Sequence, residues 1–270
     1  MDLTLLLVML LIGLGAGILG SLFGIGGGLF IVPALTLIVG LTTKEAAAVS
    51  LVSIVATSVG GTVFYLDNKI ANIRLGLLLE ISTVIGAIIG ATVSAYMDDW
   101  WVTFVFVIVI VFSALRMALN VKADIPDDEN GQFVYRDNKT GKEIRYSIRN
   151  GKTGFVTCSA AGVISSLTGV GGGLVKVPVM NMLMGVPMKV ATATSSYMIG
   201  ITAFSGAIIY FLNGQVILDV AAFTAIGTFL GAVLGSRLSK RFDGSSMKRY
   251  FSILLFIVAV MMIMRLGGIM

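Results

Sequence analysis

The chain has 270 residues, of which 57% are hydrophobic and only 12% are charged, and its mean hydropathy is +0.99. Soluble domains carry about 25% charged residues, so this composition excludes an ordinary soluble protein. One cysteine and no histidine argue against a zinc or haem centre. The net charge of +5 is small, and in a membrane protein it reports orientation more readily than nucleic-acid binding. We therefore expect a protein of the lipid bilayer without metal or cofactor.

Apolar segments in chain order predict ten helical pieces, at about 3–19, 28–39, 46–66, 75–97, 100–119, 153–167, 173–184, 190–212, 216–238 and 247–267. A crossing takes about 20 apolar residues, and six pieces qualify: 46–66, 75–97, 100–119, 190–212, 216–238 and 247–267. The other four form two pairs, each with a longer piece, a glycine-rich break and a short half-helix. The first piece lacks the basic residues of a signal peptide, so we expect it to stay in the membrane domain.

One long polar stretch divides the chain. It runs from Lys122 to Asn150, and its residues 132–135 and 142–146 flank a turn in the manner of a small β-hairpin. We interpret it as a solvated linker, with a regulatory or partner-binding role as the alternative. The predicted division is a first transmembrane repeat at 1–121, a cytoplasmic linker at 122–150 and a second repeat at 151–270.

An internal repeat is the strongest feature of the sequence. The motif FGIGGGLFIVP at 23–33 recurs as TGVGGGLVKVP at 168–178, which places Gly171 145 positions after Gly26. The same spacing matches Ser21 with Ser166, Gly40 with Gly185, Lys44 with Lys189, Ser50 with Ser195, Thr57 with Thr202, Gly61 with Gly206, Tyr65 with Tyr210 and Asn68 with Asn213. After a small gap, Gly86-x-x-x-Gly90 matches Gly227-x-x-x-Gly231. We predict an all-α polytopic membrane protein of two repeats, each with about four helical segments and a broken first element.

Loop charges indicate how the repeats are oriented. The loop after 75–97 carries Asp98 and Asp99, whereas the matching loop of the second repeat carries Arg237, Lys240, Arg241, Lys248 and Arg249. The preceding turn has Lys69 and Arg74 in the first repeat and no basic residue at 213–215 in the second. Basic loops stay in the cytoplasm, so equivalent loops lie on opposite sides and the repeats are inverted.

Inversion requires each broken element to enter and return on one side, and a long bent helix is the alternative. We then expect both termini on the periplasmic or extracellular side, and the 122–150 linker in the cytoplasm, of an inner (plasma) membrane protein.

The glycine breaks are the predicted binding site. They consist of Gly26, Gly27, Gly28, Gly171, Gly172 and Gly173. Non-helical backbone at this depth is tolerated only where it lines a cavity or is covered by protein. The half-helix after each break begins with free N–H groups and about half a positive charge, which suits an anion. We expect a small anion to bind between the two half-helix N-termini near the midplane; close packing alone is the alternative.

Polar side chains complete the predicted site. The hydroxyl candidates are Ser21, Ser166, Thr168, Ser50, Ser195, Thr57 and Thr202, although Ser50 and Ser195 could instead bond to their own helices. Lys176, which stands where the first repeat has Ile31, is the candidate for direct anion contact, with snorkelling or an ion pair as alternatives. Glu80 is the candidate for proton coupling and otherwise an interfacial or paired carboxylate.

These motifs resemble the TauE/SafE family of sulfite and organosulfonate exporters. The resemblance covers essentially the whole chain and includes both glycine motifs and the Ala-Thr-Ala-Thr-Ser-Ser run at 191–196. It implies a permease for small sulfur-containing anions such as sulfite or a sulfonate, whose three oxygens suit two converging helix N-termini. Lys176 and the long linker depart from the family pattern.

We therefore expect a secondary transporter that exports such an anion by rocking one half against the other around the breaks. Import of a related anion or organic acid is the alternative, and a channel or scaffold is less favoured. An enzyme is not expected, because histidine, a cysteine pair and paired intramembrane carboxylates are missing from the sequence. The Gly-x-x-x-Gly motifs serve helix packing within a protomer or in a homo-oligomer.

Overall fold

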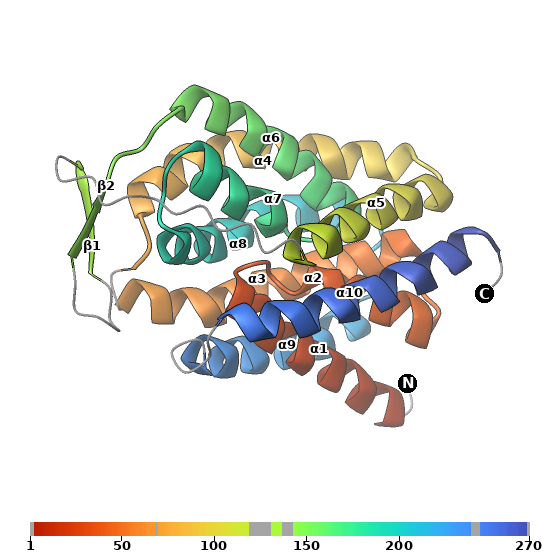
Figure 1. Cartoon of the computed structure of the whole chain (residues 1–270). Helices are drawn as coiled ribbons and strands as arrows, with labels where there is room; N and C mark the ends of the chain where they lie inside the picture. Colours follow the sequence, from red (N-terminus) through yellow and green to blue (C-terminus); the bar gives the residue numbers. More distant parts are fainter. Residues whose placement is uncertain (1–2, 68–69, 119–130, 137–142, 239–243, 269–270) are drawn as a thin grey trace.

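The computed structural model describes residues 3–67, 70–118, 131–136, 143–238 and 244–268. These residues form ten α-helices, two π-helical turns and one β-hairpin (Figure 1). The first half contains α1 (Leu3–Phe23), α2 (Gly28–Ala34), η1 (Leu35–Val39), α3 (Thr43–Asp67), α4 (Ile73–Tyr96) and α5 (Asp99–Ala118). The polar stretch contains β1 (Phe133–Arg136) and β2 (Glu143–Tyr146). The second half contains α6 (Gly151–Thr168), α7 (Gly173–Pro178), η2 (Val179–Leu183), α8 (Met188–Leu212), α9 (Leu218–Leu238) and α10 (Gly244–Leu266).

Among the described residues, five helices are long and apolar enough to cross a membrane: α1, α3, α4, α8 and α9. This confirms an all-α polytopic membrane protein. Four of them correspond to predicted single spans, and α1 is long enough by itself although the sequence assigned it to a broken pair. The predicted spans 100–119 and 247–267 correspond to α5 and α10, whose apolar stretches among the described residues are Asp99–Leu115 and Leu255–Leu266.

Each half-helix has a proline near its middle and widens after it. Pro33 lies in α2 and Pro178 in α7, and π-helical turns follow both helices directly. Proline has no N–H to donate and its ring clashes with the carbonyl four residues earlier. A wider turn accommodates that loss, which explains why both halves deform at the same place.

The repeat extends to the last helix without a gap. Helices α2 and α7, α3 and α8, α4 and α9, and α5 and α10 all begin 145 positions apart. The structure therefore corrects the glycine alignment. A Cβ on Gly90 would lie 2.8 Å from Val163 Cα of α6, and one on Gly235 would lie 2.8 Å from the equivalent Ile18 Cα of α1. Gly86 and Gly90 thus match Gly231 and Gly235. The alignment could slip by one step because α9 carries a third glycine, Gly227, four residues before Gly231.

The first helix of each half packs against a helix of the other half. Helix α1 lies along α9, and α6 lies along α4. A Cβ on Gly17 would lie 2.8 Å from Thr228 Cα, and one on Gly162 would lie 3.0 Å from Ala87 N. Such contacts bring two backbones together and are possible only for glycine. Together with the contacts of Gly90 and Gly235, they confirm that the glycine motifs of α4 and α9 pack helices within the chain.

Two glycines of α1 provide a matched test of this packing. We expect Gly17→Ala to lower the free energy of unfolding by about 1–3 kcal/mol, because the new methyl group overlaps α9 and forces the helices apart. Gly15→Ala places its methyl group in open space, with no heavy atom within 4 Å, and should leave stability unchanged or slightly raised. Thermal unfolding in detergent measures both, and equal losses would contradict the contact.

The two ends of the helical bundle differ. The start of α1 and the end of α10 lie at one end, and the β1–β2 hairpin lies at the other (Figure 1). At the end with the termini, Lys44 N donates to Asp99 Oδ1 at 2.9 Å. At the hairpin end, Asn72 N donates to Thr194 Oγ1, also at 2.9 Å. We call these the termini end and the hairpin end.

The hairpin is anchored on the bundle. Strands β1 and β2 pair antiparallel with Phe133 opposite Tyr146. Asn72 donates from Nδ2 to the Tyr146 hydroxyl at 2.9 Å, and its Oδ1 accepts from Leu75 N and caps α4. Burial raises the pKa of Tyr146, which keeps the phenol neutral. Most of the remaining 122–150 stretch lies outside the described residues, as do three of the basic loop residues, Lys69, Lys240 and Arg241.

Candidate functional site

The two glycine breaks touch each other at the centre of the bundle. A Cβ on Gly28 would lie 2.8 Å from Val170 Cα, and one on Gly173 would lie 2.8 Å from Ile25 Cα. Each break therefore packs its backbone against the other, as two related halves would. Ile54 of α3 and Ile199 of α8 both lie beside Gly26 and Gly171 and cover the contact.

The breaks adopt backbone conformations that favour glycine. Gly26 and Gly27 have φ of +81° and +86°, and Gly171 and Gly172 have φ of +87° and +70°. Residues with a Cβ are strained there. Among the described residues, no backbone carbonyl accepts from the N–H groups of the first two residues of α2 or of α7. These four N–H groups are donors available to an anion.

Ser50 and Ser195 bond across the centre rather than to their own helices. Ser50 Oγ donates to Gly169 O of the second break at 2.7 Å, and Ser195 Oγ donates to Gly24 O of the first break at 3.3 Å. The donors and the acceptors are related by the 145-residue repeat. Both serines therefore hold the opposite break in position.

Three other predicted hydroxyls face their own helices. Ser21 Oγ donates to Ile18 O, Thr57 Oγ1 to Ser53 O and Thr168 Oγ1 to Ile164 O, at 3.1, 3.0 and 2.7 Å. This is ordinary side-chain bonding within a helix. In this conformation the structure does not bring these three hydroxyls to the contact between the breaks.

Two adjacent buried hydroxyls of α6 lack a hydrogen-bond partner among the described residues. They are Ser165 Oγ and Ser166 Oγ, and both side chains are fully buried. A Cβ on Gly172 would lie 3.3 Å from Ser165 Oγ, so this hydroxyl faces the second break. A buried hydroxyl without a partner is costly. The sequence reading missed Ser165, because its counterpart in the repeat is Gly20.

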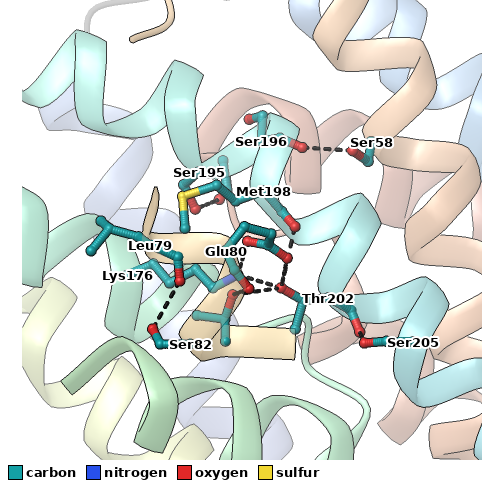
Figure 2. A network of polar contacts seen from close by, with 12 residues as sticks. Ser58, Leu79, Glu80, Ser82, Lys176, Ser195, Ser196, Met198, Thr202 and Ser205 are labelled. Atoms are coloured by element: carbon teal, nitrogen blue, oxygen red, sulfur yellow. Dashed lines mark hydrogen bonds and ion pairs between the residues drawn. The ribbon is translucent and has the colours of Figure 1, made fainter. Parts of the chain in front are cut away.

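The structure brings Lys176, Glu80 and Thr202 together (Figure 2). Lys176 of α7 has no exposed surface, and its Nζ lies 3.3 Å from Oε2 of Glu80 on α4. The same Nζ donates to Thr202 Oγ1 of α8 at 2.5 Å, and the Thr202 hydroxyl donates to Glu80 Oε1 at 2.5 Å. In this conformation Lys176 is thus in an ion pair, the alternative to direct anion contact.

Broken helices that meet at the centre of a helical membrane protein are typical of secondary transporters. The half-helices of this protein meet in the same way. A family model described as "Sulfite exporter TauE/SafE" matches residues 9–262, and the chain belongs to this family.

Similar proteins are named as transporters. The "Probable membrane transporter protein YunE" of Bacillus subtilis is 28% identical over 95% of this chain and 96% of its own length. The "Probable membrane transporter protein MJ0441" of Methanocaldococcus jannaschii is 27% identical over 97% of both chains. The "Sulfite exporter TauE/SafE family protein 3" of Arabidopsis thaliana is 30% identical over 50% of this chain and 31% of its own length. No solved structure matches.

Proposed function

We propose that this protein is a secondary transporter that exports a small sulfur-containing anion, such as sulfite or an organosulfonate, across the plasma membrane. Membership of the family and the names of its relatives support the class of substrate. The observation that carries the proposal is the contact between the two glycine breaks. It gathers the free N–H groups of two half-helices at one place.

The proposed anion site lies where these breaks separate. The free N–H groups of Gly28 and Leu29 would donate from one side and those of Gly173 and Leu174 from the other, whereas Gly26 N already donates to Gly20 O at 3.4 Å. Ser165 supplies a hydroxyl donor beside the second break, and the hydroxyl of Ser166, which also lacks a partner among the described residues, lies against Gly206 of α8. Lys176 supplies the positive charge, on the helix that begins at this break.

The arrangement of the helices supports inverted repeats. Helix α1 runs from the termini end towards the hairpin end, whereas its counterpart α6 begins just after the hairpin (Figure 1). Basic side chains gather at the hairpin end, on the hairpin, in the segment that follows it or in the first turns of helices: Arg74, Arg145, Arg149, Lys152 and Lys189. Because basic segments stay in the cytoplasm, we propose that the hairpin is cytoplasmic and that both termini lie on the opposite side.

Alternating access then involves bodies other than the two halves. The sequence led us to expect one half rocking against the other. However, α1 is packed backbone to backbone on α9, and α6 on α4, and each pair joins both halves. We propose that α1, α3 and α9 move as one unit against α4, α6 and α8, with the glycine breaks between them.

Anion binding to the purified protein tests the proposed site. We expect a two-carbon sulfonate to raise the unfolding temperature of the wild type, and sulfate and a carboxylate to do so less. Gly172→Ala should weaken binding about tenfold, equivalent to about 1.4 kcal/mol, because its Cβ crowds Ser165 in a strained conformation. Gly185→Ala carries the same backbone strain, with φ of +73°, outside the breaks, and should bind as the wild type does.

The outcomes are distinct. A wild-type protein that no anion stabilises would contradict the proposed function. Equal weakening in both glycine variants would place the anion elsewhere. Efflux of the sulfonate from preloaded proteoliposomes of known orientation then checks the direction of transport.

A further inference from the structure

The ion pair between Lys176 and Glu80 has no counterpart in the first repeat. The residues 145 positions away are Ile31 in place of Lys176 and Ala225 in place of Glu80. Ile31 is fully buried, as Lys176 is. Thr228 of α9 and Thr83 of α4 keep equivalent bonds, donating to Ala225 O and Glu80 O, so the backbones around the two places correspond. The same local fold therefore forms at the matching position, beside Ile31 and Ala225, without any charge.

A buried pair that the fold does not need requires another explanation. Removing two charges from water is expensive, and well-packed apolar residues are often as stable. Ionisable residues inside a membrane usually belong to pathways for ions or substrates. Lys176 also lies on the half-helix that starts at the second glycine break, where its N–H donates to Gly172 O at 3.0 Å.

We propose that this ion pair is the proton-coupling device of the transporter, and that the substrate anion and Glu80 compete for Lys176. The proposal rests on the proposed anion site. When Glu80 takes up one proton, its carboxylate becomes a neutral acid and releases the Lys176 ammonium. The anion then becomes the counter-ion of Lys176. When the anion leaves, Glu80 loses the proton and the original pair re-forms.

Thr202 links the two states. In this structure its hydroxyl accepts from Lys176 Nζ and donates to Glu80 Oε1. A protonated Glu80 can donate to the same oxygen, so the hydroxyl hydrogen becomes free to turn. Thr83 Oγ1, 3.4 Å from Thr202 Oγ1, offers a new acceptor. The change therefore needs only a rotation of hydroxyl groups and no unpaired charge.

Two other titratable side chains near the pair do not compete for the proton. Cys158 of α6 interacts electrostatically with Lys176 and Glu80, and Tyr197 of α8 with Glu80. A thiol and a phenol are ordinarily neutral at pH 7. Within the described part of the chain, Glu80 is thus the group beside Lys176 that can accept a proton.

The exchange makes transport electrically silent for a monovalent anion. One negative charge and one proton bind together, so the loaded and empty sites have equal charge. The membrane potential then does no work on the loaded carrier. The gradients of the substrate and of the proton set the direction of movement.

The test is the pH dependence of binding of a two-carbon sulfonate, a strong acid whose own charge does not change in the range studied. In the wild type, the sulfonate should bind about tenfold more tightly for each pH unit that the pH is lowered, with uptake of about one proton per anion. Titration calorimetry in two buffers of different ionisation enthalpy measures that uptake. In Glu80→Gln, binding should be independent of pH and release or take up no proton.

A matched control and a second variant separate the outcomes. Glu45→Gln changes a half-buried carboxylate at the termini end, which accepts from the Thr42 hydroxyl, and should keep the wild-type pH dependence. The double variant Lys176→Met with Glu80→Gln carries no buried charge, and should lose anion binding while still unfolding cooperatively. Wild-type binding that is independent of pH would overturn the exchange but leave the anion site standing. No binding at any pH would overturn both.

Discussion

Lys176→Met should be one of the most destabilising substitutions in this protein, and Glu80→Gln made in addition should restore most of the loss. Glu80 is 4% exposed, and in the single variant its carboxylate would stay buried without a cation. Breaking a buried pair by removing one partner costs about 3–5 kcal/mol, whereas replacing both partners by neutral groups is often harmless. In the double variant, the amide introduced at position 80 and the Thr202 hydroxyl can bond to each other.

Thermal or chemical unfolding in detergent, at neutral pH, measures this difference. The single variant should recover stability as the pH is lowered, because a protonated Glu80 carries no unpaired charge. A double variant that is less stable than Lys176→Met alone would contradict the pairing in the structure.

A disulfide between α3 and α8 should stop transport, whereas one between α3 and α9 should not. Both bonds join the first half to the second, so two rigid halves would be locked equally by either. Helix α9 is also held to α3 by a bond from Thr228 Oγ1 to Ser53 O at 3.0 Å. We propose that α3 and α9 belong to one moving unit and α8 to the other, so the bond from Ser58 Oγ to Ser196 O between α3 and α8, at 2.7 Å, would break during the movement.

Suitable cysteine positions exist for each bond. A Cβ at Gly200 of α8 would lie 2.7 Å from Ser58 Cβ of α3, and one at Gly60 of α3 would lie 3.2 Å from Ala232 Cβ of α9. A disulfide separates Cβ atoms by about 3.8 Å, so each bond needs a helix shift of about one ångström or less. The background variant is Cys158→Ala, which removes the one native thiol.

Sulfonate flux into proteoliposomes, measured before and after reduction, gives the result. The 58–200 bond should lower the flux about tenfold or more until it is reduced, and the 60–232 bond should leave it within about twofold. Full transport with the 58–200 bond closed would contradict the proposed movement. Loss of transport with both bonds would support the two halves as the moving bodies.

Much of the architecture can be predicted from the sequence, because it depends on local composition. Apolar runs placed α3, α4, α8 and α9, since a helix that crosses lipid needs a minimum apolar length. The glycine motifs located both breaks and both half-helices, since glycine permits the backbone conformations found there. The 145-residue spacing identified the two repeats. The same motifs pointed to the family.

The partners of the polar side chains depend on the tertiary structure. Lys176, Glu80 and Thr202 were separate candidates, because no local pattern relates residues 96 and 26 positions apart. From the sequence, Ser50 and Ser195 could bond to their own helices, yet both donate hydrogen bonds to the opposite break. Ser21, Thr57 and Thr168 are predicted to line the site, yet each of them donates to its own helix. A hydroxyl can satisfy its bonding either way, so the choice depends on which backbone lies within reach.

The sequence by itself thus determined where four of the five long apolar helices lie, where the helices break and that the chain is duplicated. Only the tertiary structure decided that α1 pairs with α9 and α6 with α4, and that Gly86 corresponds to Gly231. Repeating glycines at a four-residue step fit several registers equally well along one helix. Contact with the backbone of a second helix allows only one of them, because an atom in the wrong register would overlap its neighbour.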